Sequence, residues 1–178
     1  MKLALSLLLL GAFAVFSFTV KNRLNTKESP VTALKLSAPM PDFTLPDAGG
    51  QPVKFSDVSR QNKLVLINFW ATWCTPCRME MPEFERMYAA KKNERFTLLA
   101  IIVDKEREKA EAYLKNKPVS FPVLIDKDGA VSKQLGLQAL PTTILVGEDG
   151  KVLQVIEGVQ PYIEFTVENY LRQKKHEH

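Results

Sequence analysis

The hydrophobic pattern of this chain predicts a domain in which strands and helices alternate. Two uninterrupted apolar runs, at 63–70 and 96–103, have the length of β-strands and no polar face, as in strands covered by helices on both sides. A third short run at 121–126 has the same character. The segments 82–93 and 104–116, which separate these runs, are helical in composition and period.

Two hairpins and a last helix complete the predicted domain. Residues 42–55 hold two short extended pieces around a Gly-Gly turn, and "GEDG" separates the apolar segments 142–146 and 151–157. A helix follows from about Pro161 to Gln173, since proline suits a first helical turn. This order predicts an α/β sandwich with a mixed sheet.

The first 23 residues differ from the rest and predict a targeting segment. An uncharged apolar run from Leu3 to Val20 is bounded by Lys2, Lys21 and Arg23. The run is at the lower limit of the about 17–25 residues that cross a bilayer as a helix. An uncleaved signal anchor is favoured, and a signal peptide cleaved after "AFA" is the alternative. Both place the remaining chain outside the cytoplasm, in the periplasm or on the outer face of the membrane.

Behind this segment, the stretch 25–41 carries three prolines and no clean period, so residues 24–37 are predicted to be a tether, 38–173 the domain and 174–178 a charged tail. The net charge of +4 suggests nucleic-acid binding at first sight. However, three of the basic residues flank the apolar run, and the others are interleaved with acidic ones, as in "KEREKAEAYLK". That pattern is typical of a solvated helix face, so no nucleic-acid partner is expected.

The only two cysteines, Cys74 and Cys77, lie together in "FWATWCTPCRMEMP". A structural zinc site needs four ligands, and the only histidines are His176 and His178, which we expect to be solvated in the tail. We therefore expect no metal and no cofactor. Two thiols at this spacing in an exported domain oxidise readily, which favours a redox pair over two inert cysteines.

The pair lies between a predicted strand and a helix that begins near Pro76. Cys74 is then at the helix N-cap, where free N–H groups and the helix dipole favour a thiolate and lower the pKa of the thiol. Cys74 is the predicted nucleophile. Cys77, one turn later, is the predicted buried resolving thiol, because it shares an apolar stripe with Met81, Phe84 and Tyr88.

Glu80 lies at the border of this stripe. Partial burial would raise the pKa of its carboxyl, which could then take the proton of Cys77 during exchange. The alternative is a surface glutamate paired with Arg78 or Arg86. Glu83 is expected to be solvated, and Pro82 is expected to kink the helix.

Together, "NFWATWCTPCRMEMP", the later "LPTTILVGEDGKV" and the leading "APMPDFTLPDAGGQPVKFSDV" resemble the thiol-disulfide oxidoreductases of the TlpA/ResA type. The resemblance covers residues 38–172. It implies a thioredoxin-like fold, a mixed central sheet flanked by helices, with an N-terminal β-hairpin extension that this branch shares with peroxiredoxins. It also implies that Cys74 attacks, that Cys77 resolves and that Glu80 is the acidic residue of the site.

The resemblance further implies a cis peptide between Leu140 and Pro141, where the backbone of Leu140 pairs with a substrate strand. Trp73, Thr75 and Pro76 would contact the substrate. Trp70 and Trp73 match residues that shield the site, although plain core packing is an equal alternative for Trp70. Asn68 stands where cytosolic thioredoxins carry a buried aspartate, and it cannot take a proton, which leaves that task to Glu80.

The direction of electron flow depends on the dipeptide Thr75-Pro76, which has no histidine and no positive charge to hold a thiolate. We expect a reductant within the range of about −270 to −120 mV of this fold. The first hypothesis is a monomeric reductase of disulfides in exported proteins, apocytochrome c among them, supplied by a membrane electron donor. A disulfide-introducing oxidase and a non-catalytic binding module are the alternatives. A peroxiredoxin is disfavoured, because Ile67 and Ala71 occupy the positions of its required proline and threonine.

Overall fold

The computed structural model describes residues 34–173, and its centre is a five-stranded mixed sheet in the order β5-β4-β3-β6-β7. Strands β3, β4 and β5 are parallel, whereas β6 is antiparallel to β3 and β7 is antiparallel to β6. The sheet consists of β3 (Leu64–Trp70), β4 (Phe96–Ile102), β5 (Val123–Ile125), β6 (Thr142–Gly147) and β7 (Val152–Glu157). All three predicted apolar runs are therefore strands, and the predicted mixed sheet is confirmed.

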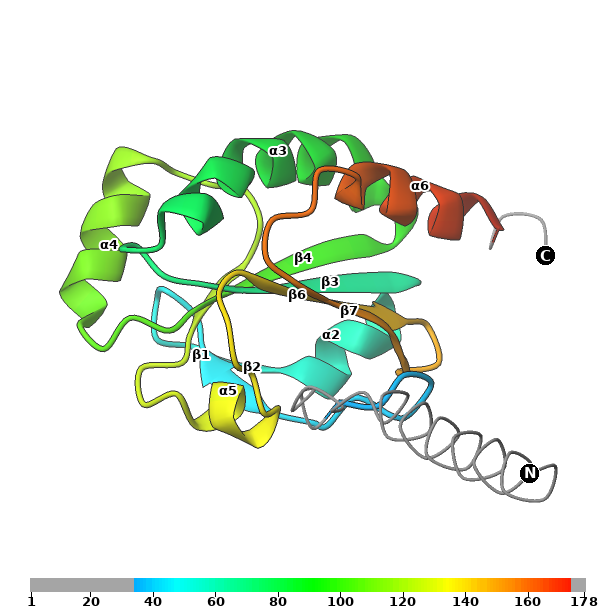
Figure 1. Cartoon of the computed structure of the whole chain (residues 1–178), viewed down its shortest axis with the longest axis horizontal. Helices are drawn as coiled ribbons and strands as arrows, with labels where there is room; N and C mark the ends of the chain where they lie inside the picture. The colour runs from blue at the N-terminus through cyan, green and yellow to red at the C-terminus, as the bar shows by residue number, and fades with distance from the viewer. Residues whose placement is uncertain (1–33, 174–178) are drawn as a thin grey trace, which may run out of the picture. The chain divides into compact units, whose positions relative to one another are not determined.

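Helices cover both faces of the sheet (Figure 1). One face carries α3 (Thr75–Lys91) and α6 (Ile163–Gln173), and the other carries α2 (Phe55–Gln61) and α5 (Ala130–Gln134). The remaining elements are α4 (Arg107–Asn116), the short 3₁₀ helix η1 (Lys92–Glu94), and the hairpin of β1 (Thr44–Pro46) and β2 (Pro52–Lys54). The hairpin is antiparallel, with Leu45 opposite Val53, as the sequence predicts.

The central strand β3 is buried along its whole length, and its side chains divide between two cores. Leu64, Leu66 and Trp70 pack in the core beneath α3 and α6. Val65, Ile67 and Phe69 alternate with them and pack in the core formed with the N-terminal hairpin, α2 and α5. This alternation follows from the two-residue period of a strand, and it decides which side chains meet the cysteine-bearing helix.

The cysteine-bearing helix begins at Thr75 after its cap Cys74, as predicted, and it continues through Pro82 to Lys91. Two other helices begin later than predicted. The helix predicted from Asp104 begins only at Arg107, since the Asp104 carboxylate is held by the loop after β3. The last helix begins at Ile163 rather than near Pro161. The short helices α2 and α5 were not predicted from the sequence.

The predicted targeting segment 1–23 and the charged tail 174–178 lie outside the described residues. Among residues 34–173, no helix combines the length and the apolar character needed to cross a membrane. Contacts with the domain begin within the segment 24–37, because Leu34 is buried in the core on the hairpin side and the Ser37 N–H donates to the Val152 carbonyl.

Candidate active site

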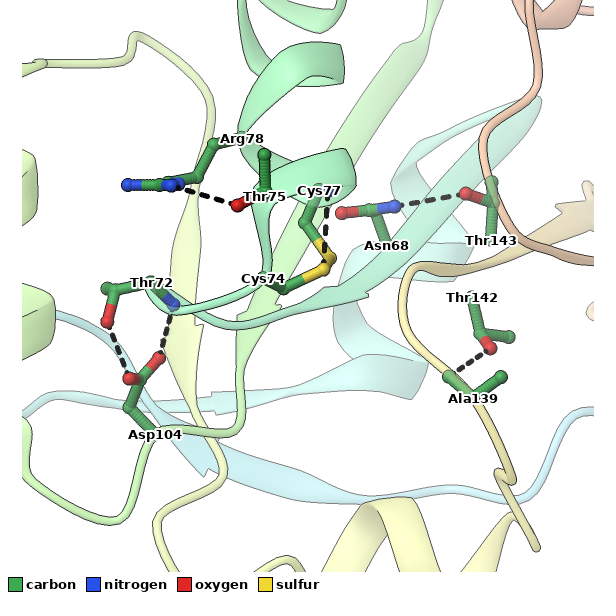
Figure 2. The surroundings of a disulfide bond; sticks show 10 residues. All are labelled: Asn68, Thr72, Cys74, Thr75, Cys77, Arg78, Asp104, Ala139, Thr142 and Thr143. Carbon is green, nitrogen blue, oxygen red and sulfur yellow. Dashed lines mark hydrogen bonds between the residues drawn. A yellow bond between two sulfur atoms is a disulfide. The ribbon is translucent and has the colours of Figure 1, made fainter.

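The two cysteines form a disulfide at the start of α3 (Figure 2). Cys74 is the N-cap residue of the helix, and its sulfur accepts a hydrogen bond from the Cys77 backbone N–H at 3.3 Å. Pro76 lies in the first turn, where its missing N–H needs no partner. The predicted position of the pair, between a central strand and a proline-started helix, is confirmed.

The two sulfurs differ in access. Cys77 is fully buried with Met81 and Phe84, whereas Cys74 is 5% exposed and is followed by the exposed residues Thr75 and Pro76. Tyr88, placed on the same stripe by the sequence, is only half-buried, and Met87 is buried instead. Cys74 is thus the one member of the pair that an outside thiol or disulfide can reach.

Glu80 is buried more deeply than the sequence predicts, with 4% of its surface exposed. Its Oε1 accepts a hydrogen bond from the Gln160 backbone N–H at 3.0 Å, and its Oε2 has no partner in the described part of the chain. Burial raises the pKa of the Glu80 carboxyl; the bond from Gln160 opposes this effect, and the negative charge of Glu83 adds to it. The direction of the predicted shift is confirmed.

The alternative of a surface glutamate paired with Arg78 or Arg86 is wrong, since Glu80 is buried and forms an ion pair with neither arginine among the described residues. The Arg78 guanidinium donates to the Thr75 Oγ1 at 3.2 Å, and Glu80 is held by backbone instead. Gln160, in the loop between β7 and α6, was not found from the sequence, because its contribution is a backbone N–H from a distant segment. No residue-type signal marks such a donor.

A second buried carboxylate, Asp104, holds the loop that leads to Cys74 (Figure 2). It accepts hydrogen bonds from the Thr72 N–H at 2.7 Å and from the Thr72 hydroxyl at 2.6 Å. The sequence did carry a signal for this contact. Asp104 directly follows the apolar run of β4, and the carboxyl ends of the parallel strands β3 and β4 meet at one edge of the sheet.

The peptide bond between Leu140 and Pro141 is cis, as the resemblance implies. Pro141 is buried, its carbonyl accepts from the Gly158 N–H at 2.8 Å, and β6 begins at the next residue. The Thr142 hydroxyl donates to the Ala139 carbonyl at 2.7 Å, which closes this turn beside the disulfide (Figure 2). Within residues 34–173, the backbone N–H and carbonyl of the half-buried Leu140 make no hydrogen bond.

The two tryptophans near the disulfide have different environments. Trp70 is fully buried and contacts Tyr113 edge to face, with ring centroids 5.1 Å apart. Its surroundings are those of a core residue, so the core alternative is correct for Trp70. Trp73, immediately before Cys74, is 68% exposed and presents an aromatic surface beside the reactive sulfur.

Asn68 lies in the middle of β3 and is fully buried. Its side-chain nitrogen donates to the Thr143 Oγ1 at 3.0 Å, and its oxygen has no partner among the described residues. The structure therefore brings together Cys74, Cys77, Glu80, Asn68 and the cis-proline turn. Such an arrangement can cycle between a disulfide and a dithiol, with a carboxyl of raised pKa nearby.

Comparisons with known proteins agree with this chemistry. A model of the AhpC/TSA family matches residues 36–155. Thiol-disulfide oxidoreductase ResA of Bacillus thuringiensis subsp. konkukian is 34% identical over 166 residues, which are 93% of this chain and 90% of the relative. ResA of Geobacillus kaustophilus is 33% identical over 85% of this chain and 84% of its own. A crystal structure from Chlorobium tepidum, described as a thiol:disulfide interchange protein DsbE, superposes with a TM-score of 0.71 at 32% identity and covers 79% of this chain and 98% of its own.

Proposed function

This chain belongs to the AhpC/TSA family, among its thiol-disulfide oxidoreductases of the ResA type, and from this premise we propose that it reduces disulfides of exported proteins through Cys74 and Cys77. The observation that carries the proposal is the position of the pair. Cys74, which is 5% exposed, caps α3, and the fully buried Cys77 donates its backbone N–H to the Cys74 sulfur. An N-cap position lowers the pKa of a thiol, so Cys74 is the attacking group.

The reaction proceeds in two exchanges. The Cys74 thiolate attacks one sulfur of a substrate disulfide, which forms a mixed disulfide and releases the other substrate sulfur as a thiolate. Cys77 then loses its proton and attacks the Cys74 sulfur, which releases the second substrate thiolate and leaves the Cys74–Cys77 disulfide. Two electrons pass from the protein to the substrate, and the described disulfide is the oxidised end of this cycle.

Glu80 takes the proton of Cys77 in the second exchange. Its carboxyl is buried on the same helix, one turn after Cys77, and its free oxygen has the capacity to accept a proton. Because burial raises the pKa of Glu80, the carboxylate is a stronger base than an exposed glutamate and its protonation is nearer to neutral pH.

The substrate binds beside Cys74 as an extended segment. The unpaired backbone of Leu140 next to Pro141 offers it a strand-like hydrogen-bond partner, and the exposed Trp73, Thr75 and Pro76 offer contact surface. This is the recognition mode in which main-chain hydrogen bonds give affinity without selecting a sequence, as a general disulfide reductase requires.

The protein works outside the cytoplasm as a monomer, held by its N-terminal apolar segment. The run from Leu3 to Val20 supports this placement. Because cytosolic thiols do not reach that compartment, a membrane protein that carries reducing equivalents across must reduce the Cys74–Cys77 disulfide after each turnover. Apocytochrome c, which needs free thiols, is one candidate substrate.

The test is the redox equilibrium of the purified domain with glutathione, together with two variants. We expect a potential in the reducing half of the fold's range of about −270 to −120 mV. Cys74→Ser should abolish reduction of a protein disulfide such as that of insulin, and alkylation of the reduced protein near neutral pH should label Cys74 before Cys77. A potential near the oxidising end would instead indicate an oxidase, and full function of Cys74→Ser would indicate a binding module.

A further inference from the structure

Asn68 lies on the same side of β3 as the cysteine-bearing helix. Leu66 and Trp70, its neighbours two positions away, pack in the core that contains Cys77. Because side chains alternate along a strand, Asn68 faces this core as well, although it is polar and fully buried. Figure 2 shows its amide oxygen directed toward the first turn of α3, which carries Cys77, and its amide nitrogen directed toward β6.

The orientation of this amide is set by the neighbouring strand. Asn68 and Thr143 are directly opposite each other in the antiparallel pair of β3 and β6, and the Asn68 Nδ2 donates to the Thr143 Oγ1 at 3.0 Å. The amide oxygen is consequently on the side away from Thr143. Among the described residues, no donor reaches that oxygen. A buried acceptor without a donor costs free energy, so it calls for an explanation.

The oxidation state of Cys77 explains why this acceptor is unpaired in the disulfide form. In the disulfide, the Cys77 sulfur is bonded to the Cys74 sulfur and has no hydrogen to donate. Reduction by two electrons and two protons breaks that bond and creates a thiol on Cys77, inside the core that Asn68 faces. A thiol is a weak hydrogen-bond donor. The reduced protein therefore gains a donor on the side of the core where the oxidised protein has an unpaired acceptor.

We infer that the Asn68 side-chain oxygen accepts a hydrogen bond from the Cys77 thiol in the reduced protein, and that this bond raises the redox potential of the pair. The bond exists in the dithiol and not in the disulfide, so it stabilises the reduced form relative to the oxidised form. Asn68 is thus a positioning residue, which holds the resolving thiol protonated until Glu80 takes its proton. The inference deepens the proposed function, and it requires only that the pair cycles between the two states.

The decisive variant is Asn68→Leu, which keeps the branched shape of the side chain and removes its acceptor. We expect the equilibrium with glutathione to shift three- to tenfold toward the disulfide, which corresponds to a potential lower by about 15–30 mV. In the same variant, the oxidised protein should resist unfolding better relative to the reduced protein than it does in the wild type, because only the oxidised form loses an unpaired acceptor.

A spectroscopic measurement tests the bond itself. In Cys74→Ser the only thiol is that of Cys77, and its S–H stretch in the Raman spectrum should lie below that of a free thiol. Adding Asn68→Leu should move the band to the frequency of a free thiol. A merely structural role of Asn68 would leave this band where it was.

Thr143→Val is the matched second variant, because it removes the group that orients the amide and leaves Asn68 in place. It should shift the potential in the same direction by a smaller factor, and it remains informative if Asn68→Leu does not fold. An unchanged potential together with an unchanged S–H band would overturn the inference. A potential that rises would overturn it too, since Asn68 would then stabilise the disulfide rather than the dithiol. In either case, insulin reduction by the wild type would show that the proposed function still stands.

Discussion

Two buried carboxylates lie near the disulfide, and they differ in how their oxygens are used. Asp104, at the end of β4, has both oxygens occupied by Thr72. Glu80, on α3, has one oxygen bound to the Gln160 N–H, and the other has no partner within residues 34–173. The first carboxylate has donors at fixed short distances, and the second has room to accept a proton.

This difference separates two tasks that a redox site needs. The Asp104 carboxylate ties the loop before Cys74 to the neighbouring strand end, so it controls where the nucleophile lies. Burial raises the pKa of the Glu80 carboxyl, and in the proposed mechanism this group takes the proton of Cys77. Both groups are buried carboxylates, and they differ in the number of oxygens that accept a hydrogen bond among the described residues.

Among substitutions of the two carboxylates, Glu80→Gln should give the largest effect, since it keeps the hydrogen bond to Gln160 and removes the proton acceptor. We expect the rate of protein-disulfide reduction to fall roughly 100-fold, as for loss of a general base. The rate should be followed from pH 6 to 9 with insulin as substrate. Glu83→Gln, a half-buried glutamate on the same helix, is the control and should retain most of the activity. An unchanged rate in Glu80→Gln across this range would remove the proposed role.

Asp104→Ala should have a smaller effect and act on geometry. It leaves the Thr72 N–H without its acceptor, which costs about 1–3 kcal/mol in the free energy of unfolding. Because the loop before Cys74 loosens, disulfide reduction should slow by about tenfold. Urea unfolding and insulin reduction measure the two quantities.

Asp104→Asn separates geometry from charge at this position. Its amide oxygen can accept from the Thr72 N–H while its amide nitrogen donates to the Thr72 hydroxyl, so both contacts are retained. We therefore expect activity close to that of the wild type. If Asp104→Asn is as slow as Asp104→Ala, the negative charge matters rather than the position of the loop, and the distinction between the two carboxylates is lost.

The smallest expected effect is on the pH dependence of stability. Because the pKa of Glu80 is raised in the folded state, the folded protein keeps a proton that the unfolded chain has already lost. The free energy of unfolding should therefore fall as the pH rises from the ordinary carboxyl pKa to the raised one, and this contribution should be constant above it.

Urea unfolding of the oxidised domain at a series of pH values measures this slope. Glu80→Gln should lack this slope. In Glu83→Gln the slope should remain but shift to lower pH, because the charge of Glu83 is one cause of the raised pKa of Glu80. A slope of the opposite sign assigned to Glu80 would mean that its charged form is the one the fold favours.

Much of this architecture was accessible from local patterns. The apolar runs of β3 and β4, the turn residues of both hairpins and the proline after Cys74 each act over a few residues, so their periods and spacing predict strands, hairpins and a capped helix. The deep burial of Glu80 was underestimated, because the segment around Gln160 covers it from elsewhere in the chain. The start of α4 was placed too early for a similar reason, since a tertiary contact holds Asp104 outside the helix.

The sequence by itself predicted which groups form the candidate site: two thiols at the start of a helix, the second toward the core, with a carboxyl one turn further. These properties follow from the order of residues within one strand and one helix. Only the tertiary structure decided which donors reach which acceptors. The bonds of Asp104 with Thr72, Glu80 with Gln160 and Asn68 with Thr143 each join segments far apart in the chain, and hydrogen bonds depend on distances of a few tenths of an ångström that residue order does not encode.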